Sequence, residues 1–166
     1  MAIDGNCGSG KSTLASLIAK VYECNLFHMD HYFLRPGQKT ESRLKEAGGN
    51  VDYDRFSREI IGGLASRRGF WYRIYDCKNQ VLGRPVPVSP QKINIVEGSY
   101  SMHPAFRCHY DLRIFLRIEE EEQQRRILER NGALMLKRFL DEWIPLENQY
   151  FQELSVEKQC DLVFLG

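Results

Sequence analysis

A glycine-rich pattern near the start of the chain ends in a lysine and a hydroxyl side chain. Residues Gly5 to Ser12 read G-N-C-G-S-G-K-S, which fulfils the pattern G-x-x-x-x-G-K-[ST] at every constrained position. Glycines allow the backbone to wrap around an anion, and free N–H groups before a helix attract phosphate oxygens. The pattern predicts that Lys11 binds the β- and γ-phosphates of ATP and that Ser12 ligates Mg²⁺. The alternative is an ordinary glycine-rich turn before a helix. The predicted nucleotide-binding residues are Gly5, Asn6, Cys7, Gly8, Ser9, Gly10, Lys11, Ser12 and Thr13.

Two acidic residues follow short apolar runs further along the chain. Asp30 ends the run Leu26–Met29, and Glu97 ends the run Ile93–Val96. Ligands of open α/β sheets gather beyond the carboxyl ends of the strands, so acids at these positions are informative. We expect Glu97 to hold Mg²⁺ together with Ser12, with helix capping as its alternative. Asp30 is the candidate base for a substrate hydroxyl, with a plain loop-starting role as its alternative.

Short apolar runs alternate with helical patterns along the chain, which indicates an α/β fold with a mainly parallel sheet. The predicted strands are Ala2–Asp4, Asn25–Met29, Ile93–Glu97, Leu112–Ile118 and Asp161–Leu165. Helices are predicted after the glycine-rich loop and over Tyr53–Ser66, Glu119–Arg130 and Ala133–Trp143, with a further helix starting at Pro145. Residues Phe70–Val88 are expected to form a hairpin or an ordered insertion. Trp143, Tyr150 and Phe151 are interpreted as core residues, and His28 as a structural histidine of its strand.

The helix at Glu119–Arg130 is highly charged and stops at Asn131-Gly132, a typical helix end. Glu121–Arg125 and Glu122–Arg126 have the i, i+4 spacing of surface ion pairs, which is one interpretation. The other is a small helical lid at residues 119–132 whose arginines neutralise the transferring phosphoryl group. Arg126 and Arg130 are the favoured catalytic residues, and Arg125 stays open as a substrate contact.

Composition limits the protein class. The 166 residues with a net charge of +1 predict one globular domain, residues 1–166, and give no reason to expect a nucleic-acid or membrane partner. Five cysteines without a CxxC pair are typical of reduced thiols. The polar loop begins by residue 5, so a signal peptide is not expected and the predicted location is cytoplasmic. Only four residues precede the loop, so either its strand is short or residues upstream of Met1 are missing. Whether the chain forms a homo-oligomer stays open.

The order of these features resembles the uridine kinase and phosphoribulokinase family. The resemblance is carried by the glycine-rich loop, Asp30 with the aromatic residues after it, Asn50-Val51-Asp52, Tyr75-Asp76 and Val96-Glu97-Gly98. It spans nearly the whole chain and implies a three-layer P-loop NTPase fold with a parallel five-stranded sheet and a mobile lid. It also implies transfer of the ATP γ-phosphate to a hydroxyl of a small metabolite. By the same resemblance Asp30 is the catalytic acid–base residue and Glu97 the magnesium-site acid, while Asp52 holds ribose hydroxyls and Tyr75 lines the nucleoside pocket.

The chain departs from uridine kinases at two places. It has Asp30-His31-Tyr32-Phe33 where they usually show Asp-Ser-Phe-Tyr, and no histidine follows Tyr75-Asp76 closely. That histidine helps to read the pyrimidine, so uridine itself is expected to be a poor acceptor. Nicotinamide riboside, pantothenate or a sugar phosphate are alternative acceptors. A nucleotide-switched ATPase without a small-molecule acceptor and an inactive, nucleotide-binding relative are the alternatives from other classes.

Overall fold

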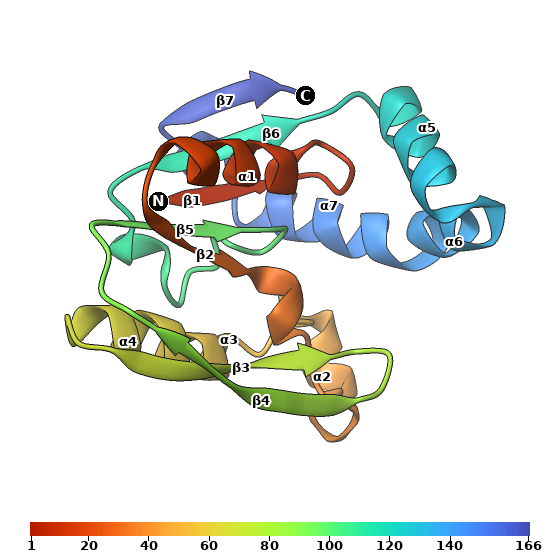
Figure 1. Cartoon of the computed structure of the whole chain (residues 1–166). Helices are drawn as coiled ribbons and strands as arrows, with labels where there is room; N and C mark the ends of the chain where they lie inside the picture. Colours follow the sequence, from red (N-terminus) through yellow and green to blue (C-terminus); the bar gives the residue numbers. More distant parts are fainter.

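A five-stranded parallel sheet forms the centre of the computed structural model, which describes residues 1–166 (Figure 1). Its strands are β1 (Ala2–Gly5), β2 (Cys24–His28), β5 (Ile93–Glu97), β6 (Arg113–Arg117) and β7 (Leu162–Leu165). Their order in the sheet is β2-β5-β1-β6-β7. All four pairings are parallel, so the carboxyl ends of the strands meet at one edge. The five strands predicted from the sequence are confirmed within one residue at each end.

Helices cover both faces of this sheet. Helix α1 (Lys11–Val21) lies on the face towards the viewer in Figure 1, and α7 (Ile144–Glu153) lies on the opposite face. The core divides accordingly: Ile3, Ala15 and Ile95 pack on the α1 side, while Phe115 packs edge-to-face against Phe151 on the other. Helix–sheet–helix layering with this parallel sheet is the predicted three-layer P-loop fold, which is confirmed.

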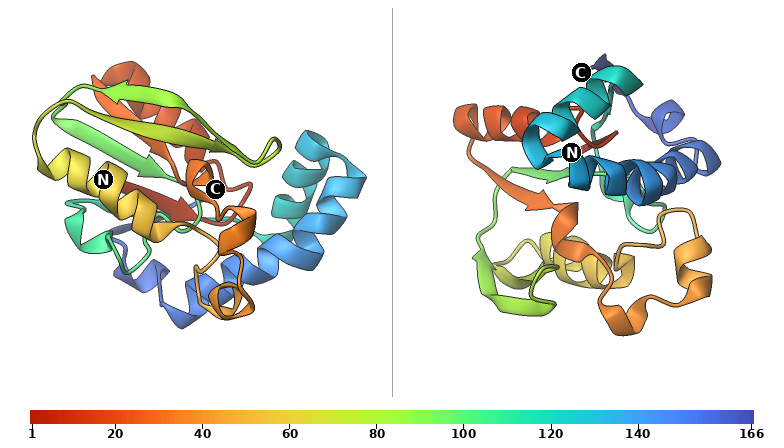
Figure 2. Two further views of the ribbon diagram at one scale, coloured as in Figure 1. Left: turned by 90° about the horizontal axis from the view of Figure 1, so that it is seen from below. Right: turned by 90° about the vertical axis from the view of Figure 1, so that its right-hand side faces the viewer.

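A hairpin and three short helices form a separate layer below the sheet, which the right-hand view of Figure 2 shows. The hairpin joins β3 (Phe70–Asp76) to the antiparallel β4 (Val81–Val88), which confirms the hairpin alternative for this segment. The helices are α2 (Glu41–Lys45), α3 (Tyr53–Phe56) and α4 (Gly62–Ala65), the last two joined by a π-helical segment at Ser57–Ile61. Short 3₁₀ turns lie at Met29–Tyr32, Pro36–Gln38, Arg107–His109 and Glu157–Gln159.

Helix α5 (Glu120–Asn131) is followed by an arm of three helical segments that share a continuous helical backbone. They are α6 (Ala133–Arg138), a π-helical segment (Phe139–Trp143) and α7. The expected helix that starts at Pro145 is confirmed as α7, which has this proline in its first turn, although no turn separates it from the preceding π-helical segment. The wider π segment ends at Trp143, where a proline ring one residue into α7 would otherwise crowd the preceding helical turn. None of the helices combines the length and hydropathy that crossing a membrane would need.

Candidate active site

The glycine-rich loop, called the phosphate loop below (Gly5–Ser12), connects β1 to α1. Gly5, Gly8 and Gly10 have positive φ values of 140°, 80° and 95°, which other residues rarely adopt. A Cβ on Gly5 would also lie 2.1 Å from the Leu116 carbonyl oxygen of the neighbouring strand. The buried Lys11 Nζ donates hydrogen bonds of 2.8 Å to the carbonyl oxygens of Gly5 and Asn6. The loop is thus curled around its own lysine, at the carboxyl end of the central strand.

Ser12 and Glu97 come together at the same edge of the sheet. The Ser12 hydroxyl lies 3.2 and 3.1 Å from the two carboxylate oxygens of Glu97, which is buried at the end of β5. His28 Nδ1 makes a short hydrogen bond with Glu97 Oε1, and this bond raises the pKa of His28. No group of three or more acidic, histidine or cysteine side chains could hold a metal by itself. Mg²⁺ commonly binds one or two protein oxygens together with substrate phosphates and water, and the Ser12 and Glu97 oxygens fit that mode.

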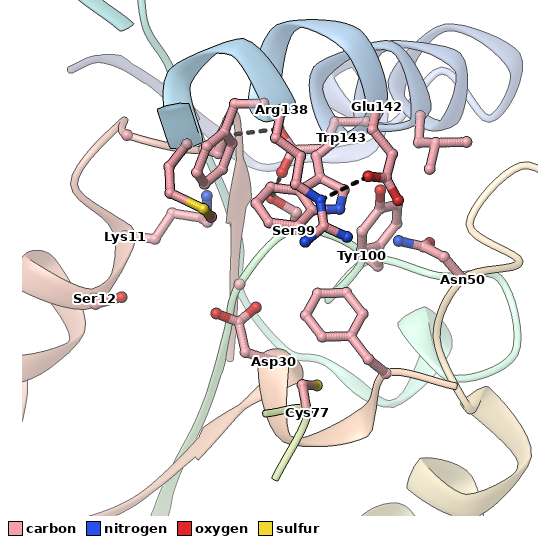
Figure 3. A pocket seen from close by; sticks show the side chains of 18 of the residues that line it. Lys11, Ser12, Asp30, Asn50, Cys77, Ser99, Tyr100, Arg138, Glu142 and Trp143 are labelled. Carbon is pink, nitrogen blue, oxygen red and sulfur yellow. Dashed lines mark hydrogen bonds and ion pairs between the residues drawn. The ribbon is translucent and has the colours of Figure 1, made fainter. Parts of the chain in front are cut away.

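Asp30 lies just beyond β2 in a 3₁₀ turn, and its carboxyl group is open to the cavity that Ser12 also lines (Figure 3). The surrounding protein raises the pKa of Asp30, first through desolvation and then through the nearby Glu97 carboxylate. Lys11 and His28 oppose this rise with their positive charges. A carboxylate that favours its protonated form more than usual is a stronger base when ionised, as general-base chemistry requires.

The raised pKa of Asp30 predicts the acid limb of the pH–activity profile. A general base must be deprotonated, so activity should fall as the pH drops through the pKa of Asp30, which lies above the ordinary aspartate value of 3.8. The measurement is kcat/KM from pH 4 to 8. The Asp30→Asn variant serves as the control, because limbs that come from titration of the substrates persist in it while the Asp30 limb disappears. Profiles of identical shape for both proteins would contradict the assignment.

Lys11, Ser12, Asp30 and Glu97 all line one cavity of about 1330 Å³. The phosphate loop, Ser12, Thr13 and Glu97 form one end of it. The cavity extends between the tip of the β3–β4 hairpin, with Cys77, and the helical arm, with Arg138, Glu142 and Trp143 (Figure 3). The aromatic residues that line the cavity are Phe33, Tyr75, Tyr100, Phe139 and Trp143, and Asn50 lines it as well. The cavity therefore offers an anion-binding end and several aromatic side chains, with Asp30 on its wall.

Helix α5 contacts the phosphate loop directly. Gln123 Nε2 donates to the Cys7 carbonyl oxygen at 2.9 Å, and Arg126 donates to the Gly8 carbonyl oxygen at 3.2 Å while pairing with Glu122. Arg126 and Arg130 line the cavity. Arg125 does not, because it points to solvent and pairs with Glu122 and Glu129. The expected Glu122–Arg126 pair is present and the Glu121–Arg125 pair is not. A lid movement of residues 119–132 stays a prediction.

Tyr75 and Asp52, the two residues assigned to the acceptor by resemblance, lie in different places. Tyr75 is buried and lines the large cavity. Asp52 caps α3 by accepting from the Arg55 N–H at 3.1 Å and also accepts from Gln38 Nε2 at 2.8 Å. Its carboxylate faces a smaller cavity of about 380 Å³ rather than the large one. In this arrangement the Asp52 carboxylate is occupied by protein donors, and ribose binding by it stays a prediction.

Sequence reasoning missed several residues of the site. Trp143 was assigned to the core, but it lines the cavity and its ring lies 4.7 Å from the Arg138 guanidinium carbon. The assignments of Tyr150 and Phe151 to the core are confirmed. His28 was interpreted as structural, yet it bonds the carboxylate of Glu97. Its position two residues before Asp30 on a strand was the only available signal. Glu147 of α7, which contacts the phosphate loop, had no sequence signal at all.

Comparisons with known proteins identify the fold. No protein-family model matches the chain, and no curated protein matches it. Several solved structures, by contrast, match the chain along nearly its whole length. A possible uridine kinase from Bacillus stearothermophilus superposes with a TM-score of 0.74 at 18% identity, covering 98% of this chain and 86% of that one. A proposed fructose transport system kinase from Silicibacter sp. TM1040 gives 0.68 at 22% identity, with coverages of 98% and 87%.

A third solved structure extends the range of acceptors among these proteins. D-glycerate 3-kinase from Cryptococcus neoformans var. grubii superposes with a TM-score of 0.64 at 14% identity, covering 99% of this chain and 84% of that one. The chain therefore has the P-loop kinase fold, and the predicted resemblance to that group is confirmed for the fold. At these low sequence identities the structural similarity shows the fold alone. The names of the three proteins refer to different acceptors.

Proposed function

We propose that the chain is an ATP-dependent phosphotransferase that moves the γ-phosphate of ATP to a hydroxyl group of a small metabolite. The observation that supports this most is the convergence of three features in one cavity. The phosphate loop with Lys11, the Ser12–Glu97 oxygen pair and the open Asp30 carboxyl all line it. The same cavity is also lined by several aromatic side chains. A protein that only binds or hydrolyses ATP would not need such an apolar pocket next to a general base like Asp30.

The residues of the phosphate end would act by positioning and by charge. Lys11, released from the Gly5 and Asn6 carbonyl oxygens, would neutralise charge on the β- and γ-phosphates. Arg126 and Arg130 would face the same group from α5. Ser12 and Glu97 would hold Mg²⁺, which when bound screens the phosphate oxygens and orients them for in-line transfer.

Asp30 would accept the proton of the acceptor hydroxyl as that oxygen attacks phosphorus. Its carboxyl is open to the cavity, and desolvation with the Glu97 charge favours proton uptake. Closure of the lid at residues 119–132 over bound ATP would exclude water, which would otherwise compete with the acceptor.

A nucleoside is the acceptor class that we place first. Phe33, Tyr75, Phe139 and Trp143 could stack on a flat ring, and Asn50 could pair with its edge. The absence of a histidine after Tyr75-Asp76 makes uridine a weaker choice than other ring-bearing alcohols. Nicotinamide riboside, pantothenate and sugar phosphates remain the alternative acceptors.

Acceptor-dependent release of ADP tests the proposed function. The purified chain with MgATP should release ADP slowly alone and at least about tenfold faster with one compound of a panel, since water is a poor competitor in a closed site. The panel should contain nucleosides, vitamins, hydroxy acids and sugar phosphates. ADP release that no compound accelerates would favour a nucleotide-switched ATPase instead.

A further inference from the structure

Glu147 joins the phosphate loop to the turn that follows the magnesium-site acid. Its Oε2 accepts a hydrogen bond of 2.9 Å from the Cys7 backbone N–H, in the middle of the loop. Its Oε1 accepts a 2.7 Å bond from the hydroxyl of Ser99, two residues after Glu97. These three elements, α7, the phosphate loop and the end of β5, are far apart in the sequence. One carboxylate therefore bridges both halves of the phosphate end.

The bridge lies in a buried setting. The Glu147 side chain is only 6% exposed, and no lysine, arginine or histidine forms an ion pair with it. A buried carboxylate without a cationic partner is costly unless its oxygens accept hydrogen bonds. Here the cost is offset by an amide of the phosphate loop and by the Ser99 hydroxyl. A negative charge beside a phosphate-binding loop also repels ATP, so any benefit of Glu147 to binding must come from its two hydrogen bonds.

The same helix makes a second contact behind the loop. Tyr150, three residues after Glu147, donates a 2.8 Å bond to Oδ2 of Asp4, the residue just before the loop. Burial raises the pKa of Asp4 to about 6, and hydrogen bonds from the Met102 N–H and from Tyr150 oppose this rise. Helix α7 thus holds the strand before the loop through Tyr150 and the loop itself through Glu147.

We propose that Glu147 is a positioning residue that holds the phosphate loop in its binding conformation and in register with the Glu97 turn. The role depends on the nucleotide binding proposed above. A loop that is ordered in advance loses less conformational entropy when ATP binds, so its affinity is higher. The hydrogen bonds of Glu147 carry this role, and its negative charge works against it.

The substitution Glu147→Gln separates these two effects. The oxygen of the amide side chain can accept from the Cys7 N–H, and the NH₂ group can donate to Ser99 Oγ. The Ser99 hydroxyl would then donate to the Gly5 carbonyl oxygen, which already lies 3.1 Å away. Glu147→Gln thus keeps every hydrogen bond without the charge, whereas Glu147→Ala removes both the charge and the bonds.

The dissociation constant of MgATP, measured by titration calorimetry without any acceptor, tests this role. We expect the alanine variant to bind about tenfold more weakly than the glutamine variant, since two hydrogen bonds of about 0.7 kcal/mol each are lost. The glutamine variant should bind as tightly as the wild type or more tightly. Glu153→Ala, which removes an exposed carboxylate from the same helix, should leave the constant unchanged.

The outcomes separate this role from a purely structural one. Equal dissociation constants for the alanine and glutamine variants would overturn the proposed role, whatever their melting temperatures. If Glu147→Ala does not fold, Ser99→Ala replaces it and should weaken MgATP binding at least about threefold, because it removes one hydrogen bond of the bridge to the Glu147 carboxylate. Unchanged affinity of that variant would equally overturn the role. A wild-type chain that binds no MgATP would instead overturn the proposed function, and this inference with it.

Discussion

Replacing Lys11 by alanine is expected to lower kcat/KM about 10²–10³-fold, the usual cost of removing one preorganised charge-stabilising donor. The ammonium group already lies inside the loop, bonded to the Gly5 and Asn6 carbonyl oxygens, so little reorganisation is needed to meet a phosphate. The measurement is steady-state turnover with the best acceptor found in the panel. Near-normal turnover of a folded variant would refute the assignment of the phosphate loop.

Two control variants make the Lys11 result specific. Lys20→Ala removes an exposed lysine from the last turn of the same helix and should leave kcat/KM unchanged. Lys11→Met keeps most of the aliphatic stem but not the charge, so it should lose as much activity as the alanine variant. Recovery of activity in the methionine variant would show that the stem packs the loop and that the charge is not needed.

The second large effect is expected for Asp30→Asn, which should lower kcat about 10²–10⁴-fold, the typical contribution of a general base. The amide has nearly the shape of the carboxylate but cannot accept the proton of the acceptor hydroxyl. Asp30 lies beside the Ser12–Glu97 pair without belonging to it, so the affinity for MgATP should change by less than about tenfold, or 1.4 kcal/mol.

Separate measurements of kcat and of the MgATP dissociation constant distinguish the roles that Asp30 could have. Unchanged kcat would remove Asp30 as the base. A large loss of MgATP affinity with normal saturated turnover would make it a metal ligand instead. Asp54→Asn, at an exposed aspartate of α3 outside the large cavity, controls for the loss of one negative charge.

Features with a local sequence signal were predicted well. The five strands followed from short apolar runs, and the phosphate loop from a pattern that specifies its own backbone conformation. Ser12 and Glu97 were expected to meet because both follow strands of one parallel sheet, and their oxygens lie 3.1 Å apart. In these cases each short stretch of sequence carries its own signal, and the parallel sheet brings the ends of its strands to one edge.

Features that depend on packing between distant segments could not be predicted. Glu147 meets Cys7 across 140 residues, and its spacing on α7 is that of any helical glutamate. Trp143 has the helical spacing of a core residue, but the π-helical segment that ends there lines the cavity. Asp52 was assigned by resemblance, yet Gln38 and Arg55 engage its carboxylate, because the short segments around it fold into their own layer.

The most direct test of the proposed kinase function is identification of the phosphorylated product. The chain should be incubated with MgATP and the acceptor that most increases ADP release, and the products followed by ³¹P NMR. We expect a new phosphate monoester signal that grows in step with ADP, with little inorganic phosphate, and that is absent with Lys11→Ala. ADP accompanied by an equal amount of inorganic phosphate, with no monoester for any acceptor, would contradict a phosphotransferase and identify an ATPase.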